Sequence, residues 1–383
     1  MLFRNWFRGA LLVLTFGFLF HTSIITSRAD KTGSDAQDSR RNVSRFLAKA
    51  RSGKMVSIAF LGGSVSAGSG VSDPSKSSYR ALVVQWLKQR YSPAKIVEVN
   101  AAVPGTGSTY GAMRARRDCI AQKPDLVVVE FAADDSSEKE DVIRRSLEGI
   151  VRQLLTVPQP PEIIFLYAPV PGRTLPVDTG DVVANFYRIP SIRVDTTATM
   201  WKENLALNEE GARLVAKAVT DRFEDDERQT PLPPVKVLAP PAFSDELTYG
   251  ELIPFAQLKH DATWKNEPVN DRSLPSMLLV SDKLGSQLET FFEGTVVGIA
   301  FRSGPDGGQF ECLIDGKPAQ APLDRVDTYD PVNRISTRII AGGLGGGEHR
   351  LTIRVTGERS PKSSSTHVKL GYLIVGGQRP ERL

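Results

Sequence analysis

The chain of 383 residues has few of the side chains that form disulfide frameworks or bind metals, because it holds only two cysteines and four histidines. Two cysteines, Cys119 and Cys312, cannot form a disulfide framework or a cysteine-based metal site. We expect both to be buried free thiols, and a single bridge between the two halves of the chain is the alternative. The four histidines leave few options for a catalytic base or a metal site, and no cofactor is expected.

The chain also lacks a dense run of basic residues. Lys and Arg total 48 against 44 Asp and Glu, a formal net charge of +4. This balance excludes a nucleic-acid-binding signature. Apolar residues make up 40% and charged residues 24%, which is typical of a globular protein. At ~150 residues per domain, the length predicts two domains.

The N-terminus carries a targeting pattern at residues 1–29. Arg4 and Arg8 precede an apolar run at Gly9–Ile25, and the small residues Ser27 and Ala29 follow it. A basic start, a short apolar run and a small-residue site are typical of a secretory signal peptide. The run is shorter than the ~20 residues of a spanning helix, so cleavage is favoured over an uncleaved membrane anchor. Both alternatives predict an extracytoplasmic protein, periplasmic or secreted, and only the uncleaved alternative anchors it to the membrane, through residues 9–25.

The next part of the chain predicts an α/β domain. Residues 30–54 form a polar lead-in with a short helical pattern, and residues 55–224 alternate apolar strands with amphipathic helices. This alternation indicates a parallel sheet covered by helices on both faces. The expected strands are 56–61, 96–99, 126–131, 163–167 and 189–194, and the expected helices are 77–90, 109–122, 138–157 and 211–223. The arginines of the helix 109–122, Arg114 among them, are expected at solvent positions.

A proline-rich linker and an antiparallel β-sandwich of the jelly-roll kind are predicted after the α/β domain. Five prolines fall within residues 231–241 of the predicted linker, 225–242. Residues 243–378 lose the helical period and show short β-branched and aromatic runs between glycine-rich turns. The expected strands are 277–280, 288–292, 296–301, 309–314, 335–340, 349–355 and 368–375.

Three segments that follow predicted strands could carry chemistry. The first holds Gly63 and Ser64, the second Gly105 and Gly107, and the third Asp134 with Asp135. Since ligands bind beyond the carboxyl ends of parallel strands, these loops are expected to meet at one rim, together with 168–180. The structural alternatives are a flexible glycine loop or helix cap at Ser64, and a helix N-cap at the two aspartates.

The order and spacing of these segments resemble the SGNH/GDSL hydrolase superfamily. Gly-Gly-Ser-Val-Ser resembles its first block, Asn-Ala-Ala-Val-Pro-Gly its second, and the segment from Val129 to Asp135 its third. The resemblance implies a flavodoxin-like three-layer fold, no metal, and esterase or deacetylase action on acylated glycans. It implies Ser64 as nucleophile and Gly105 as an oxyanion-hole N–H, with Gly63, Gly107 and Asp135 beside the substrate. The sandwich resembles the C-terminal domain of bacterial two-domain members.

The sequence departs from the family pattern at its catalytic positions. The family's oxyanion-hole Asn falls on Asp134, and the frame set by Asn208 and Gly211 places Glu203 on the family's Asp and Ala206 on its His. Serine is a poor nucleophile without an adjacent base. An ionised aspartate would also repel the developing oxyanion, whereas a protonated one could donate to it if burial raised its pKa.

Other groups could supply the missing base. His21 lies in the leader, so His260, His349 and His367 of the predicted sandwich are the remaining histidines. Of these, His349 is expected in a solvated turn, whereas His260 or His367 could reach Ser64 if the domains pack closely. Glu203 and Glu209 are carboxylates whose usual pKa of ~4.3 makes them weak bases at neutral pH.

Two functions of different class remain. The first is an ester hydrolase acting on acylated extracytoplasmic glycans. The second is a catalytically inactive relative that binds a glycan or serves as a scaffold, and Ala206 and Asp134 favour it. A further idea is sugar stacking on aromatic rings of the sandwich, for which Trp264, Phe291, Phe292 and Tyr329 are available, although core packing is favoured for Phe291 and Phe292.

Overall fold

The computed structural model describes residues 42–202, 206–231, 238–271, 273–322 and 324–377. These residues belong to one compact unit, 40–383. The predicted signal segment 1–29, most of the lead-in before residue 42, and Glu203 lie outside the described residues. Within the described ranges, no helix has both the length and the apolar character needed to cross a membrane.

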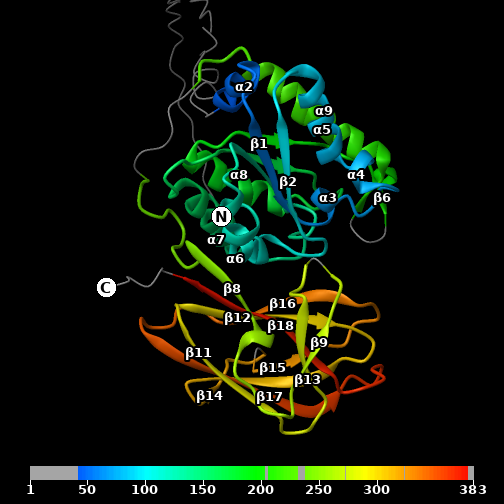
Figure 1. Cartoon of the computed structure of the whole chain (residues 1–383), viewed down its shortest axis with the longest axis vertical. Helices are drawn as coiled ribbons and strands as arrows, with labels where there is room; N and C mark the ends of the chain where they lie inside the picture. Colours follow the sequence, from blue (N-terminus) through cyan, green and yellow to red (C-terminus); the bar gives the residue numbers. More distant parts are fainter. Residues whose placement is uncertain (1–41, 203–205, 232–237, 272, 323, 378–383) are drawn as a thin grey trace, which may run out of the picture. The chain divides into compact units, whose positions relative to one another are not determined.

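A five-stranded parallel sheet forms the centre of the α/β part (Figure 1). Its strand order is β2-β1-β3-β4-β5, the flavodoxin-like order that the resemblance implied. Strands β3 and β4 are buried along their whole length, as expected for strands covered on both faces. The bounds are β1 Val56–Gly62, β2 Ile96–Ala102, β3 Leu126–Glu130, β4 Glu162–Tyr167 and β5 Ser191–Arg193.

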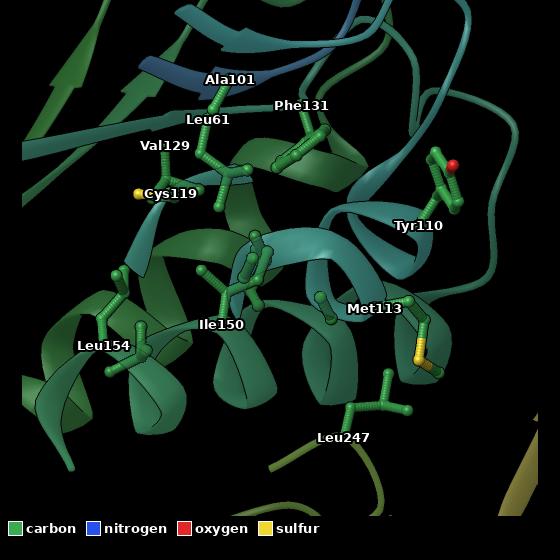
Figure 2. Packing of buried hydrophobic residues seen from close by; sticks show 14 of the residues in the cluster. Leu61, Ala101, Tyr110, Met113, Cys119, Val129, Phe131, Ile150, Leu154 and Leu247 are labelled. Atoms are coloured by element: carbon green, nitrogen blue, oxygen red, sulfur yellow. The ribbon is translucent and has the colours of Figure 1, made fainter. Parts of the chain in front are cut away.

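Helices cover both faces of this sheet because successive strand residues point to opposite sides. On one face Ile58 and Phe60 pack with α2 (Ser44–Arg51), α5 (Tyr79–Arg90) and α9 (Glu209–Asp226). On the other face, Leu61 and Val129 pack with α6 (Ser108–Asp118), α7 (Glu140–Leu155) and α8 (Leu175–Tyr187). Figure 2 shows this second core, with Ile150 and Leu154 of α7 below the sheet residues.

The C-terminal part consists of two antiparallel sheets that enclose their own apolar core (Figure 1). All seven predicted strands are confirmed. The first sheet contains β8 (Tyr249–Pro254), β9 (Lys265–Pro268), β10 (Met277–Ser281), β12 (Val296–Ser303), β16 (Arg334–Ala341) and β18 (Val368–Gly377). The second contains β11 (Gln287–Glu293), β13 (Gly308–Ile314), β14 (Lys317–Pro318), β15 (Arg325–Asp327) and β17 (Glu348–Arg359).

Two sequence expectations about the α/β part are wrong. The segment 168–180 is not all loop, because α8 begins at Leu175. Pro176 lies in the first turn of α8, which is compatible with a helix start. Arg114, expected at a solvent position, is fully buried, where its guanidinium donates to the carbonyl oxygens of Gly62 and Ala101. Buried carbonyl acceptors and Asp118, 3.3 Å away, replace water around its charge.

Both cysteines are free and buried, as expected. Of the aromatic residues considered for sugar stacking, Trp264 and Phe292 lie in the core of the C-terminal part. Phe291 does not, because the alternation along β11 turns it outward and leaves it 59% exposed. The expectation of core packing is therefore confirmed for Phe292 and wrong for Phe291.

Candidate active site

Three strand ends meet at the carboxyl edge of the parallel sheet. In the strand register, Gly62 of β1 lies beside Ala102 of β2 and Glu130 of β3. The three candidate loops therefore start at the same level of the sheet. Ser64 opens the short helix α3 (Ser64–Ala67) directly after β1 and is only 4% exposed.

Ser64, Gly105 and Asp134 form one closed hydrogen-bond group. The Ser64 hydroxyl donates to Asp134 Oδ1 at 2.7 Å, and the Ser64 N–H donates to Asp134 Oδ2 at 2.7 Å. The Gly105 N–H donates to Ser64 Oγ at 2.9 Å. The sequence predicted that these three residues would meet, but it did not predict that the hydroxyl would be directed to the carboxylate. The Gly105 N–H, which the resemblance assigns to the oxyanion hole, and the Ser64 N–H are both engaged inside the protein.

Burial governs the titration of Asp134. It raises the pKa of Asp134 to about 6, although hydrogen bonds from Ser64 and Gly105 oppose the rise. Gly63 leaves the space for this carboxylate, since a Cβ there would lie 2.0 Å from Asp134 Oδ2. A side chain at position 63 would therefore displace Asp134.

Asp135 and Gly107 lie next to the hydrogen-bond group of Ser64, Gly105 and Asp134. Asp135 forms its own hydrogen bond, to Ser108. Asp135 Oδ1 accepts the N–H of Ser108 at 2.8 Å and thereby caps the start of α6. Burial raises the pKa of Asp135 to about 7. Neither aspartate caps α7, which starts at Glu140 without a side-chain cap, so that structural alternative is wrong.

A third buried acid, Glu130, lies behind the serine loop, and the sequence analysis did not single it out. Its Oε2 accepts a hydrogen bond of 3.3 Å from Ser66, whose hydroxyl also bonds to the hydroxyl of Tyr79. Burial, and next the charge of Asp134, raise the pKa of Glu130 well above its ordinary value. The sequence feature that could have identified Glu130 is its position as the last residue of an otherwise apolar strand.

The position that the sequence pattern assigns to the family's histidine holds a small apolar side chain, Ala206. Ala206 lies in β7 (Ala206–Leu207), which pairs with β6 (Trp201–Lys202) and contacts α3, the helix that carries Ser64. Ala206 is fully buried. Asn208 caps α9 by accepting the N–H of Gly211 at 3.0 Å.

The other base candidates make contacts elsewhere. His260 Nδ1 lies 2.8 Å from the carbonyl oxygen of Leu258, and His349 lies 2.9 Å from both Asp315 and the carbonyl oxygen of Gly345. His367 Nδ1 lies 3.2 Å from Asp306. Exposed Glu209 accepts the N–H of Ser72 at 2.7 Å, and this bond lowers its pKa. Among the described residues, no histidine is hydrogen bonded to Ser64.

The comparisons with known proteins agree with this fold. Residues 60–226 match the family model of the GDSL-like Lipase/Acylhydrolase family. The predicted resemblance to the SGNH/GDSL superfamily is confirmed for this stretch. No curated protein matches the chain.

Solved structures extend the likeness to both parts of the chain. A two-domain esterase (CEX) active on acetylated mannans, co-crystallised with mannopentaose, has a TM-score of 0.76 at 19% identity, covering 90% of this chain and 98% of its own. A second structure of a two-domain esterase (CEX) active on acetylated mannans has a TM-score of 0.73 at 20% identity, covering 89% of this chain and 97% of its own. The chain therefore has the fold of this two-domain esterase, a parallel α/β part followed by antiparallel β-sheets.

Proposed function

We propose that the chain binds an acylated glycan at the carboxyl edge of its parallel sheet and does not turn it over by serine–histidine–acid catalysis. The observation that carries this proposal is the direction of the Ser64 hydroxyl, which donates to Asp134 at 2.7 Å. In a serine esterase this proton goes to a base that then passes it to the leaving group.

The lack of a base at position 206 supports the proposal. Loss of one triad member leaves a residual ~10³–10⁴-fold acceleration over water, because the triad works as a unit. Ala206 offers no proton acceptor, and the three described histidines contact acceptors in the C-terminal part.

The filled oxyanion site supports it further. A substrate carbonyl oxygen would have to displace Ser64 Oγ from the Gly105 N–H, and Asp134 Oδ2 from the Ser64 N–H. Loss of one oxyanion donor costs on the order of 10²–10³ in rate. An ionised Asp134 adds repulsion of ~4 kcal/mol at close range with an effective dielectric near 20.

An acylated glycan as ligand is supported by the fold likeness to the esterase active on acetylated mannans. Fold alone does not establish function, so the ligand class needs a direct test. The rival is the ester hydrolase of the sequence analysis, in which Ser64 attacks the ester.

The proposal is tested with three proteins: the full-length chain, Ser64→Ala, and the double variant Asp134→Asn with Ala206→His. Each is incubated with a fluorophosphonate probe, and the adduct is mapped by mass spectrometry. Each is also titrated calorimetrically with an O-acetylated mannooligosaccharide while acetate release is followed. We expect the wild type to bind the oligosaccharide without labelling at Ser64 and without releasing acetate.

The double variant is the positive control, because it restores both missing groups. Labelling of Ser64 in the wild type together with acetate release would replace the proposal by the esterase hypothesis. Absence of binding at pH 5 and at pH 8, in protein shown to be folded, would remove the glycan as ligand.

A further inference from the structure

The oxyanion site is filled by groups of the protein itself. Asp134 uses both carboxylate oxygens on Ser64, one on its N–H and one on its hydroxyl. The hydroxyl in turn accepts the Gly105 N–H. Because Ser64 is 4% exposed, water does not readily replace these partners. An ionised Asp134 accepts both hydrogen bonds and has no proton to donate, so what this group can offer to a ligand depends on the charge state of Asp134.

We propose that Asp134 is a proton-controlled gate of this site: the carboxylate closes it on Ser64, and the carboxylic acid opens it to the neutral carbonyl oxygen of an ester. This inference rests on the proposed function, because the ester is taken to belong to the bound acyl glycan. It adds the condition under which binding occurs.

The opening follows from where the proton sits. A proton on Oδ1 turns that oxygen from an acceptor into a donor, while Oδ2 still accepts the Ser64 N–H. The Ser64 hydroxyl then loses its acceptor, and its oxygen can instead accept the new Asp134 O–H together with the Gly105 N–H. Rotation of the hydroxyl away from an entering ester releases both donors. A carbonyl oxygen can now accept from Gly105 and from the Asp134 O–H, the donor that the family's asparagine supplies. No covalent bond is made, and the only proton exchanged comes from solvent.

The burial of Asp134 and the charged groups around it determine the pKa of its carboxyl group. Glu130, at the end of the same strand, and Asp135, its neighbour in the chain, are buried acids. Arg114 of α6 is the buried cation that favours the charged form of Asp134, together with the hydrogen bonds from Ser64 and Gly105. Burial outweighs these groups and raises the pKa of Asp134 to about 6.

The size of the expected effect follows from the population of the acid form. With a pKa of about 6, the acid form makes up about 90% of molecules at pH 5 and about 1% at pH 8. The apparent affinity of a ligand that needs the acid form should therefore fall about ninety-fold between these two pH values.

The test combines a binding and a titration measurement on the full-length chain. Binding of an O-acetylated mannooligosaccharide is measured at pH 5 and pH 8 for the wild type, Asp134→Asn and Glu209→Gln. The last is a matched control, since Glu209 is an acid near the serine loop that contacts Ser72 rather than Ser64. In parallel, aspartate labelled with ¹³C at the carboxyl is titrated by NMR, with Asp134→Asn identifying the signal.

We expect the wild type and Glu209→Gln to bind more tightly at pH 5 and Asp134→Asn to bind equally at both pH values. The Asp134 signal should titrate near pH 6, and the amide signals of Ser64 and Gly105 should move with it. Equal wild-type binding at pH 5 and pH 8 would overturn the gate while leaving the proposed function intact. If neither the wild type nor Asp134→Asn binds at either pH, the proposed function fails. The amide signals of Ser64 and Gly105 then decide whether the gate exists. Movement of these signals with the titration of Asp134 supports the gate, and no movement overturns it.

Discussion

At the scale of single residues, the sequence pattern predicts two departures from the family at this site, and they would act in different ways. In the predicted register, Ala206 takes the place of a base without adding a charge. Asp134 takes the place of a donor and, when ionised, offers only acceptor oxygens to a developing oxyanion. Under this prediction each change alone would block one requirement of ester hydrolysis, and repair of one would leave the other.

We therefore expect Ala206→His alone to remain nearly inactive on p-nitrophenyl acetate. Adding Asp134→Asn should raise the initial rate by a further ~10²–10³-fold, the value of one oxyanion donor. Position 206 is fully buried, so overpacking of ~1–3 kcal/mol is expected, and circular dichroism must confirm that each variant is folded. A high rate in Ala206→His alone would show that Asp134 does not hinder the reaction.

Asp134 also predicts a pH dependence of stability. Its ordinary pKa of 3.8 is raised to about 6 in the folded protein. Between these values the folded state binds more protons than the unfolded chain, so the free energy of unfolding falls as the pH rises. The loss is complete above pH 6 and is on the order of 3 kcal/mol.

Urea unfolding at pH 4 to 7.5 checks this, with Asp134→Asn as the reference. Glu130 and Asp135 titrate in both proteins, so only the difference between the two curves reports on Asp134. The wild type should lose stability relative to the variant as the pH rises. Parallel curves would show that the pKa of Asp134 is not raised.

The sequence predicted which residues would surround Ser64, because motif spacing after parallel strands fixes which loops meet. It did not predict the burial of Arg114 or the role of Glu130. A charged side chain is buried only when the tertiary structure supplies partners. For Arg114 these are two carbonyl oxygens at strand ends far apart in the chain.

At the scale of elements, the start of helix α2 is stabilised by acidic side chains that belong to other elements. Its N-cap residue, Val43, makes no side-chain cap. Instead Glu162 of β4 accepts the N–H groups of Arg45 and Phe46, at 3.2 and 2.6 Å, and Asp226 of α9 accepts that of Val43 at 3.0 Å. The carboxylates thus satisfy the free N–H groups at the helix start and attach the helix to the domain.

Glu162→Ala should therefore destabilise the protein by about 2–4 kcal/mol, because two helix N–H groups lose their acceptor. Asp73→Ala is the matched control, since Asp73 caps the exposed short helix α4 (Pro74–Ser77) and a local cap contributes ~1 kcal/mol. Chemical denaturation followed by tryptophan fluorescence measures both. Equal effects would show that Glu162 acts only as an ordinary cap.

The elements that were predicted and those that were missed differ in their apolar pattern. Strands β3 and β12 are apolar except at their carboxyl ends and were predicted from sequence. Helix α8 was missed because its buried residues include Pro176, Thr179 and Gly180, which do not mark an apolar stripe. Strands β6 and β7 have two residues each, which is too short to show an alternation of apolar and polar residues.

At the scale of the whole molecule, α7 attaches the segment that leads into the C-terminal part. Buried Glu148 accepts the N–H groups of Ala242, Phe243 and Ser244 at 2.6, 2.9 and 2.6 Å. Gln153 donates to the carbonyl oxygen of Leu247 at 2.9 Å. The sequence predicted a linker here but could not predict these contacts, because they depend on tertiary packing rather than on local pattern.

These contacts predict that the two parts unfold together. Glu148→Ala would leave three backbone N–H groups and the Tyr187 hydroxyl, 2.6 Å from Glu148, without their acceptor. Each buried donor left unsatisfied costs ~1–3 kcal/mol. We therefore expect a large loss of stability, and separation of the single calorimetric transition into two.

Asp141→Ala is the control for this variant, because Asp141 is an exposed acid in the first turn of the same helix. Its removal should lower the transition temperature by at most about two degrees, because an exposed acid at a helix N-terminus contributes only ~0.3–1 kcal/mol to stability. Glu148→Gln retains one oxygen acceptor and should fall between the two. A single, unshifted transition in Glu148→Ala would mean that the apolar contacts of Leu247 with α7 are sufficient to join the two parts.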